Sequence, residues 1–358
     1  MTFVATFFLN LHRMKKWWLL VLLIWAIDVR SQDGGRTVYS FLEVPASARI
    51  AAMGGTFITV KDHDVNAALQ APSLLNAEMD NSLSFSMVSM FDGVRLGDAS
   101  YVLDKAKYGT FLASMHYASY GDFKLTNEFG DVEGSFKAAD YCLSLGWGYQ
   151  YRPRFSVGST FKVIYSDYYL YNAAGAALDF SATYQDTASN FTATILFRNI
   201  GWQFDNYVTG SQEQLPGEAL VGFSKRLSHT PLRFSVTYRH LEKFDLSYTD
   251  PNNLSDLDPL TGEAQVKEIS FGNNLSRHFI LGSEILLSKN FHLRAAYNFQ
   301  RRQELSVDTR PGTTGFSLGF GLKISKFVLS YGRAKYHLAG SSNQFSISMN
   351  LSEFTKKK

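Results

Sequence analysis

Alternation of apolar and polar residues with a period of two is the feature that most constrains the fold of this chain. The C-terminal run shows it clearly, with apolar side chains at Phe345, Ile347 and Met349 and polar side chains between them. The same pattern recurs in residues 141–150 and 316–325. Successive side chains of a strand point to opposite faces, so each run predicts a strand with one apolar and one polar face. The chain is therefore expected to be all-β.

Such strands fit either a soluble sandwich, with the apolar face inward, or an outer-membrane barrel, with the apolar face outward. Two observations favour the barrel. Aromatic residues make up 15% of the chain and gather at the ends of the expected strands, as at Tyr149, Tyr151 and Tyr165, which is typical of the aromatic girdles of a lipid-facing band. When the expected strands are numbered along the chain, all of the long connections follow odd-numbered strands, so that they lie at one end of the barrel. Long external loops at one end and short periplasmic turns at the other are typical of outer-membrane barrels.

We therefore predict a transmembrane, antiparallel, up-and-down β-barrel of about 14 strands. The expected strands lie near residues 82–91, 95–104, 108–119, 134–150, 153–171, 174–184, 190–199, 217–228, 231–247, 276–288, 290–304, 313–325, 326–338 and 343–351. The expected long loops are residues 120–133, 200–216, 248–275 and 305–312. An even number of strands places both termini in the periplasm and the long loops at the cell surface.

The N-terminus has the pattern of a secretory signal peptide. Residues 17–27 form an uninterrupted apolar run that is too short to cross a bilayer as a helix, which takes roughly 20 residues. Met14 and two lysines precede the run, as in the positively charged start of a signal peptide. We expect residues 1–31 to be removed by cleavage between Ser31 and Gln32, with Met14 as an alternative start of translation. An uncleaved membrane anchor is the other interpretation.

Between the signal peptide and the expected barrel, residues 82–358, lies a stretch without strand alternation, residues 32–81. It is rich in alanine and glycine and carries six acidic residues against three basic ones. The inward faces of the strands are mostly small and carry more basic than acidic residues, so an acidic segment would compensate charges in a confined lumen. We expect this segment to plug the barrel, the alternative being a periplasmic tail. The residues expected to hold it there are Arg49, Asp62, Asp64, Arg233, Arg239 and Arg294.

This segment also carries a resemblance to a known family. The sequence YSFLEVPASARIAAMGG at residues 39–55, followed by DHDVN at residues 62–66, resembles the N-terminal region of the PorV/PorQ family. These proteins are outer-membrane barrels of the type IX secretion system of Bacteroidota and distant relatives of the FadL fatty-acid transporters. The length of the chain favours the PorQ type. One departure is Ala71-Pro72-Ser73, where the family usually has Asn-Pro-Ala.

The resemblance implies a non-enzymatic role in the outer membrane of a Gram-negative bacterium. There the protein would anchor a PorZ-like surface protein and other proteins of the attachment complex, which processes secreted cargo and joins it to lipopolysaccharide. Outer-membrane lipid or lipopolysaccharide is a further expected contact. The alternative is a FadL-like transporter of hydrophobic small molecules, which requires an apolar path that the polar inward faces do not suggest. The net charge of +3 is too small to indicate nucleic-acid binding.

The sequence offers few residues for catalysis or cofactors. Cys142 is the only cysteine, which excludes an intramolecular disulfide and cysteine-based metal clusters. Asp62-His63-Asp64 has metal-ligand chemistry, but adjacent side chains of an extended chain point to opposite faces, and a role in anchoring the plug is favoured.

Two weaker candidates are also judged structural. The acidic stretch 250–258 has oxygen ligands for calcium but lacks the central glycine and the final glutamate of an EF-hand loop. Four histidines are possible rim residues of a surface enzyme, but no catalytic motif accompanies them. They are His116, His240, His278 and His337. We therefore predict no catalytic, cofactor or metal site.

Overall fold

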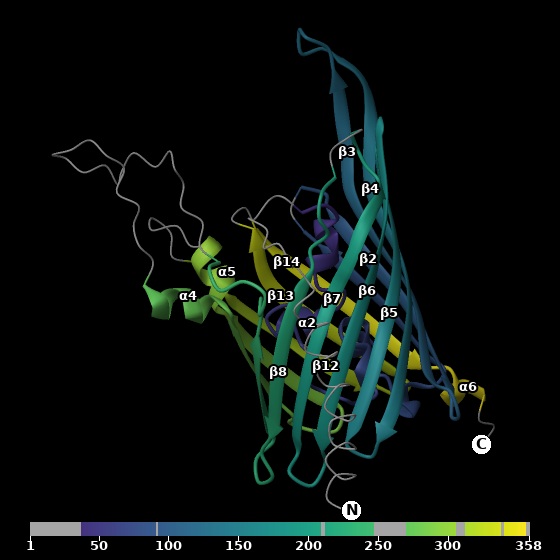
Figure 1. Ribbon diagram of the computed structural model, residues 1–358, viewed down its shortest axis with the longest axis vertical. Helices are drawn as coiled ribbons and strands as arrows, with labels where there is room; N and C mark the ends of the chain where they lie inside the picture. The colour runs from purple at the N-terminus through teal and green to yellow at the C-terminus, as the bar shows by residue number, and fades with distance from the viewer. Residues whose placement is uncertain are drawn as a thin grey trace, which may run out of the picture. The chain divides into compact units, whose positions relative to one another are not determined.

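The computed structural model describes residues 37–90, 92–208, 212–246, 270–305, 312–337 and 340–355. Fourteen antiparallel strands pair in sequence order, and β1 pairs with β14 to close the barrel (Figure 1). The predicted all-β barrel of about 14 strands is therefore confirmed. The signal-peptide prediction, with its cleavage site between Ser31 and Gln32, lies outside the described residues.

The strands follow the alternating runs of the sequence closely. They are β1 Ser82–Ser89, β2 Arg95–Lys105, β3 Gly109–Thr126, β4 Val132–Arg152, β5 Phe155–Tyr168, β6 Tyr171–Asp186, β7 Phe191–Asp205, β8 Glu218–Arg226, β9 Leu232–Tyr238, β10 Phe279–Ile285, β11 Phe291–Asn298, β12 Phe316–Ile324, β13 Phe327–His337 and β14 Gly340–Asn350.

Short helices occupy the N-terminal segment and some of the connections. They are η1 Ser40–Glu43, α2 Ala48–Ala52, α3 Val65–Gln70, η2 Pro72–Leu74, η3 Ala77–Met79, α4 Phe271–Arg277, α5 Phe299–Leu305 and α6 Ser352–Thr355. No helix among the described residues is long and apolar enough to cross a membrane.

The two faces of each strand have opposite environments. Leu145 and Leu318 are 65% and 60% exposed, whereas Ser144, the neighbour of Leu145, is only 9% exposed. The apolar face therefore points outward and the polar face inward, the reverse of a soluble sandwich. A closed barrel with an apolar outer face is the structure that spans a membrane.

Outward-facing aromatic side chains form a row across three strands. Tyr117, Tyr141 and Tyr165 are direct cross-strand partners on β3, β4 and β5, and their ring centroids lie 5.1 Å and 6.4 Å apart. Farther along β4, Trp147 stacks on Tyr149 with the ring centroids 5.9 Å apart. Rings of this kind sit at the two membrane–water interfaces, so the apolar residues between the two groups face the hydrocarbon core.

The wall of the barrel is uneven in height. β3 and β4 contain 18 and 21 residues, whereas β9 and β10 contain 7 each. Figure 1 shows β3 and β4 extending well past β8. A membrane-spanning strand needs about 9–11 residues. The β3–β4 hairpin is therefore long enough to continue past the bilayer.

The structure differs from the predicted boundaries in four connections. Residues 200–216 were expected to form a loop, but β7 runs to Asp205. Residues 120–133 were expected to form a loop, but β3 runs to Thr126 and β4 begins at Val132. The strand expected over 231–247 ends at Tyr238. The strand expected over 290–304 ends at Asn298, where α5 begins. The long connections 206–217, 239–278 and 299–315 do follow odd-numbered strands, although much of 239–278 lies outside the described residues.

The N-terminal segment, residues 37–81, contacts the inner wall on several sides. α2 packs against β11 to β14, and η2 packs against β4 to β6. Inward-facing glycines provide the room: a Cβ atom added at Gly332 would lie 2.3 Å from the carbonyl oxygen of Ala48, and one added at Gly158 would lie 2.4 Å from the carbonyl carbon of Pro72. Real Cβ atoms do not approach so closely, so these contacts require glycine.

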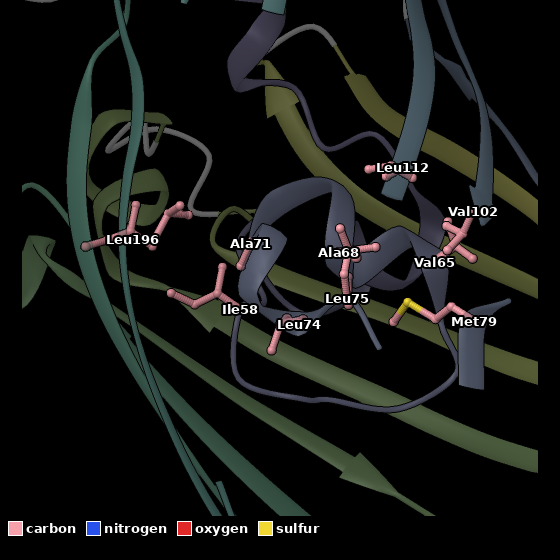
Figure 2. Packing of buried hydrophobic residues seen from close by; sticks show 12 residues of the cluster. Ile58, Val65, Ala68, Ala71, Leu74, Leu75, Met79, Val102, Leu112 and Leu196 are labelled. Atoms are coloured by element: carbon pink, nitrogen blue, oxygen red, sulfur yellow. The ribbon is translucent and has the colours of Figure 1, made fainter. Parts of the chain in front are cut away.

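An apolar cluster joins α3 and η2 to the barrel wall (Figure 2). Val65 and Leu74 of the segment are buried together with Val102, Leu112 and Leu196, which belong to β2, β3 and β7. Their burial removes apolar surface from water, which is the main favourable contribution to packing.

Candidate functional site

The N-terminal turn of α2 is fixed by the barrel. Ser47 has an extended backbone conformation, and its hydroxyl accepts a hydrogen bond from the amide of Ile50, as an N-cap residue does. The amide of Ala48 donates to the hydroxyl of Ser346 on β14, at 2.9 Å. These contacts leave the next residue, Arg49, directed at β10.

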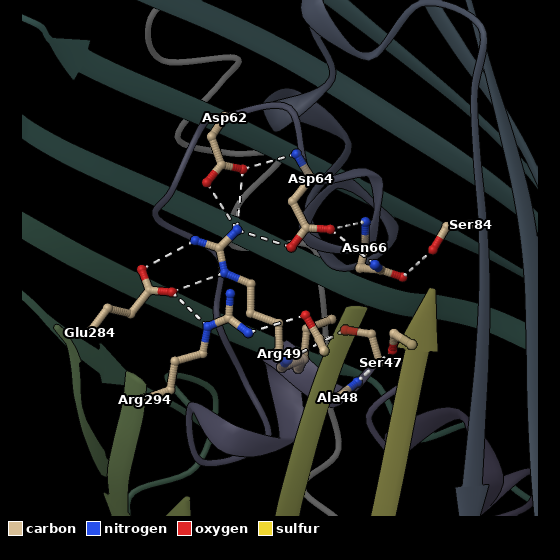
Figure 3. A network of polar contacts seen from close by, with 12 residues as sticks. Ser47, Ala48, Arg49, Asp62, Asp64, Asn66, Ser84, Glu284 and Arg294 are labelled. Carbon is tan, nitrogen blue, oxygen red and sulfur yellow. Dashed lines mark hydrogen bonds and ion pairs between the residues drawn. The ribbon is translucent and has the colours of Figure 1, made fainter. Parts of the chain in front are cut away.

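Arg49 is the centre of a buried network of charges (Figure 3). Its Nε and Nη2 donate to the two carboxylate oxygens of Glu284 on β10, at 3.0 Å and 3.1 Å. Its Nη1 donates to Asp62 and to Asp64, each at 2.9 Å. The planar guanidinium has five N–H donors in a fixed fork, so it can bind several carboxylates at once.

Two arginines of the wall complete the network. Arg294 on β11 donates from Nε to Glu284 at 3.0 Å, and Arg233 on β9 donates from Nη1 to the same carboxylate at 2.8 Å. The three arginines face three carboxylates, those of Glu284, Asp62 and Asp64, so the formal charge of the network is zero. A buried group of charges is tolerated only when it is paired and hydrogen-bonded in this way.

The surroundings of Arg49 and Asp64 favour the charged forms of both side chains. Burial opposes the charge of Arg49, but the nearby carboxylates of Asp62, Glu284 and Asp64 outweigh burial and raise the pKa of its guanidinium well above the usual value. Burial likewise opposes the charge of Asp64, but Arg49 outweighs it and lowers the pKa of this carboxyl below its usual value. Both groups are therefore charged at neutral pH.

Asp64 also links the network to the start of α3. Its side chain accepts a hydrogen bond from the amide of Asn66 at 3.0 Å and acts as the N-cap of the helix. The Asn66 side-chain oxygen accepts from the hydroxyl of Ser84 on β1, also at 3.0 Å. The network therefore connects β9, β10 and β11 on one side with β1 on another.

Arg239 does not belong to this network. Its guanidinium donates to Glu218 at the start of β8, at 2.6 Å from Nε, and Arg198 on β7 donates to the same carboxylate. The second centre therefore ties the middle of β7 and the start of β8 to the connection after β9. Of the six residues expected to hold the segment, five belong to the network of Arg49 and Glu284, and the sixth, Arg239, pairs with Glu218.

The pairing differs from the simple expectation that acidic residues of the segment would face the arginines of the lumen. Within the described part of the chain, the ion pairs across the interface join Arg49 to Glu284, while Asp62 and Asp64 pair with Arg49 itself. The reason is geometric, because one buried arginine can use both edges of its guanidinium. Glu284 was recognisable in the sequence only as an inward-facing acid.

Of the four candidate histidines, the three whose side chains are described do not assemble into a catalytic group. His116 lies parallel to Phe41, with ring centroids 5.6 Å apart. His240 contacts Glu242. Both ring nitrogens of His278 lie within 3.0 Å of backbone carbonyl oxygens. These contacts hold the connection after β9 in place, which is a structural role. The side chain of His337 lies outside the described residues.

The metal-binding candidates find no support in the described residues, where no group of three or more histidine, cysteine or acidic side chains is placed to hold a metal ion. The carboxylates of Asp62 and Asp64 both face Arg49, whereas His63 between them is exposed. The acidic stretch 250–258 lies outside the described residues.

A second apolar cluster lies against the inner wall. Val38 and Phe41 of the segment are buried together with Leu96, Ala118 and Ile164, which belong to β2, β3 and β5. We call the last three residues the inner apolar patch. The sequence showed these positions only as occasional apolar residues on otherwise polar faces.

Comparison with known proteins places the fold. No family model matches the chain, and no curated protein matches it. The toluene transporter TbuX of Ralstonia pickettii is similar in structure, with a TM-score of 0.51 and 12% identity over 86% of this chain and 98% of that one. The toluene transporter TodX of P. putida has a TM-score of 0.51 and 11% identity over 87% and 99%. At these identities the likeness shows a shared fold.

Proposed function

We propose that this protein is an outer-membrane channel for small hydrophobic molecules, with residues 37–81 acting as a plug of the lumen. The observation that carries the proposal is the inner apolar patch of Leu96, Ala118 and Ile164, which is buried in one cluster with Phe41. An apolar surface inside a barrel is a binding surface for an apolar ligand once the side chains packed on it move.

The contacts of the plug suggest which part moves. Residues from Ala48 onward are held by hydrogen bonds and ion pairs to the wall. Residues 38–44 are held mainly by apolar packing, together with a hydrogen bond from the amide of Val38 to the carbonyl of Gln214. Apolar contacts carry no directional requirement, so a hydrophobic ligand can replace Phe41 without leaving a buried charge unpaired.

The fold shared with two toluene transporters supports this function and suggests monoaromatic hydrocarbons as a substrate class. The test is uptake of radiolabelled toluene by cells that express the protein. Phe41→Ala is expected to raise uptake severalfold, because it opens the cluster that buries the patch, and Ala118→Phe is expected to abolish it by filling the patch. Ala295→Phe, on the outer face of β11, is the matched control. Uptake equal to that of cells without the protein would rule out the channel.

A second candidate function is a docking role in type IX secretion, with a PorZ-like surface protein and other attachment-complex proteins as partners. It is supported by the resemblance of residues 39–66 and by the exposed end of the β3–β4 hairpin. There Phe123 and Phe136 stack with centroids 5.2 Å apart, and Phe129 is 90% exposed. Exposed aromatic residues are typical of protein interaction sites.

The two functions separate cleanly in cells of a bacterium that uses type IX secretion. If the protein docks a secretion partner, Phe123→Ser with Phe129→Ser impairs cargo maturation and leaves toluene uptake unchanged. If it is a channel, the same variant matures cargo normally. Surface labelling of a cysteine placed at Asn127, in a Cys142→Ser background, tests whether the hairpin faces the outside, with a cysteine at Lys105 as the control.

A further inference from the structure

The outer wall of β2 to β5 carries features of a lipid site that lies away from the lumen. An apolar groove with a volume of about 510 Å³ runs across the outward faces of these strands and β1. Its floor is formed by the small side chains of Ala99 and Ala113, and larger apolar residues stand around it. These include Leu83, Leu145, Phe161 and Val163. The groove lies between the two aromatic groups, and therefore at the depth of the hydrocarbon core.

The same strands carry a group of cations where they end at the short turns. Lys105 and Lys107 lie at the β2–β3 turn, and Arg152 and Arg154 lie at the β4–β5 turn; all four are exposed. Asp186 lies 3.6 Å from Arg154. Within the described ranges, no carboxylate lies at ion-pair distance from Lys107 or Arg152. These two charges are available to an anion.

Lys107 and Arg152 are also placed by the aromatic girdle. The ammonium of Lys107 lies 5.5 Å from the ring centre of Tyr108, and the guanidinium of Arg152 lies 5.5 Å from that of Tyr151. The indole of Trp147 donates a hydrogen bond to the carbonyl of Tyr108 at 2.8 Å, which ties the β2–β3 turn to β4. Cations stacked on girdle aromatics keep their apolar stems at the interface and their charges at the level of the headgroups.

The distance from the cations to the groove matches one lipid leaflet. Ala113 lies five residues beyond Tyr108 on β3, which is about 17 Å along the strand and about 13 Å along the membrane normal at a tilt of about 40°. Half of the hydrocarbon core is about 15 Å. An acyl chain attached to a headgroup at Lys107 therefore reaches the groove.

We infer that the outer wall of β2 to β5 binds an anionic phospholipid, with its phosphate at Lys107 and Arg152 and an acyl chain in the groove over Ala113. The negative phosphate complements the two available cations, and the apolar groove is continuous with the lipid-facing band. The site lies outside the lumen, so it is independent of the proposed channel and docking functions.

The test compares two lipids on the purified full-length protein in detergent. Dioleoylphosphatidylglycerol is expected to bind more tightly than dioleoylphosphatidylcholine when bound lipids are counted by native mass spectrometry. Lys107→Gln with Arg152→Gln should weaken phosphatidylglycerol binding roughly tenfold and abolish the preference, because each cation at the membrane surface attracts anionic headgroups. Ala113→Phe should weaken binding of both lipids by filling the groove.

Matched controls isolate the site. Lys124→Gln with Lys137→Gln removes two cations from the other end of the barrel, and Ala295→Phe enlarges an outward side chain on β11; neither should change lipid binding. A heat-modifiable band on gels verifies that each variant is folded. A photoreactive phosphatidylglycerol should cross-link to peptides of β3 to β5. The inference is overturned by equal binding of the two lipids, by cross-links spread around the barrel, by equal losses in the controls, or by displacement with free glycerol phosphate.

Discussion

The tall wall of the barrel, β3 to β7, and the low wall, β9 to β11, hold the same N-terminal segment by different chemistry. The tall wall presents apolar side chains such as Leu112 and Ile164. The low wall presents Arg233, Glu284 and Arg294, which form the network with Arg49. Ion pairs and their hydrogen bonds require one geometry, whereas apolar contacts accept several. The low wall is therefore a fixed attachment, and so are the hydrogen bonds that join Ser73 to Ser156 and Ser181 on the tall wall. The replaceable contacts are those of residues 38–44 with the inner apolar patch.

The strongest test of this contrast is removal of the carboxylate shared by the low wall. Glu284→Gln removes the carboxylate that pairs with Arg49, Arg233 and Arg294. It therefore leaves uncompensated positive charge in a buried site. We expect the free energy of unfolding in urea to fall by about 3–5 kcal/mol. Glu353→Gln, an exposed carboxylate 3.9 Å from Lys323, should change it by less than about 0.5 kcal/mol. Equal effects would mean that the network contributes no more than a surface pair.

The next largest effect concerns the outer face of the tall wall. Leu145→Arg places a charge in the hydrocarbon region and should lower the free energy of unfolding in lipid vesicles by about 2–4 kcal/mol. Leu170→Arg, at the β5–β6 turn beyond Tyr165, should lower it by at most about 1 kcal/mol. A larger loss for Leu170 than for Leu145 would contradict the membrane position that the aromatic rows assign.

A methyl group tests how closely the segment approaches the wall. Gly332→Ala directs a Cβ atom at the carbonyl of Ala48, so α2 must shift, and we expect a loss of about 1–3 kcal/mol. Gly97→Ala, whose nearest atom would be 3.9 Å away, is the control and should have little effect. Limited proteolysis of residues 37–81 would show whether the loss comes from the segment.

The smallest expected effect comes from acid. Because Arg49 lowers the pKa of Asp64, the stabilisation is complete above the unfolded value of about 3.9 and is lost as the pH falls through the folded value. Proteolysis of residues 37–81 by an acid-active protease should therefore increase below about pH 4. Asp64→Asn should show faster cleavage at neutral pH and a weaker acid dependence. An unchanged acid response in that variant would assign the effect to another group.

The sequence predicted the strands well because alternation is a local signal. Phe345 and Ser346 reveal their faces without knowledge of any partner. It failed at residues 120–126, because a hairpin exposed to water on both faces has no need for alternation, and the stretch resembles a loop. The charged site was only partly predictable. Arg49 stood out in the segment, but its partner Glu284 lies 235 residues away, and no local pattern joins them.

The closure of the barrel has a consequence for biogenesis. β1 can pair with β14 only after the final strand has been made. Residues 37–81, which precede all of the strands in the chain, nevertheless contact both early and late strands. Contacts between residues so distant in sequence form slowly, because the loop between them must be closed first. The contacts of the segment with the last strands can therefore form only after those strands have been made, and an assembly factor that holds the open sheet must keep them accessible to the segment until then.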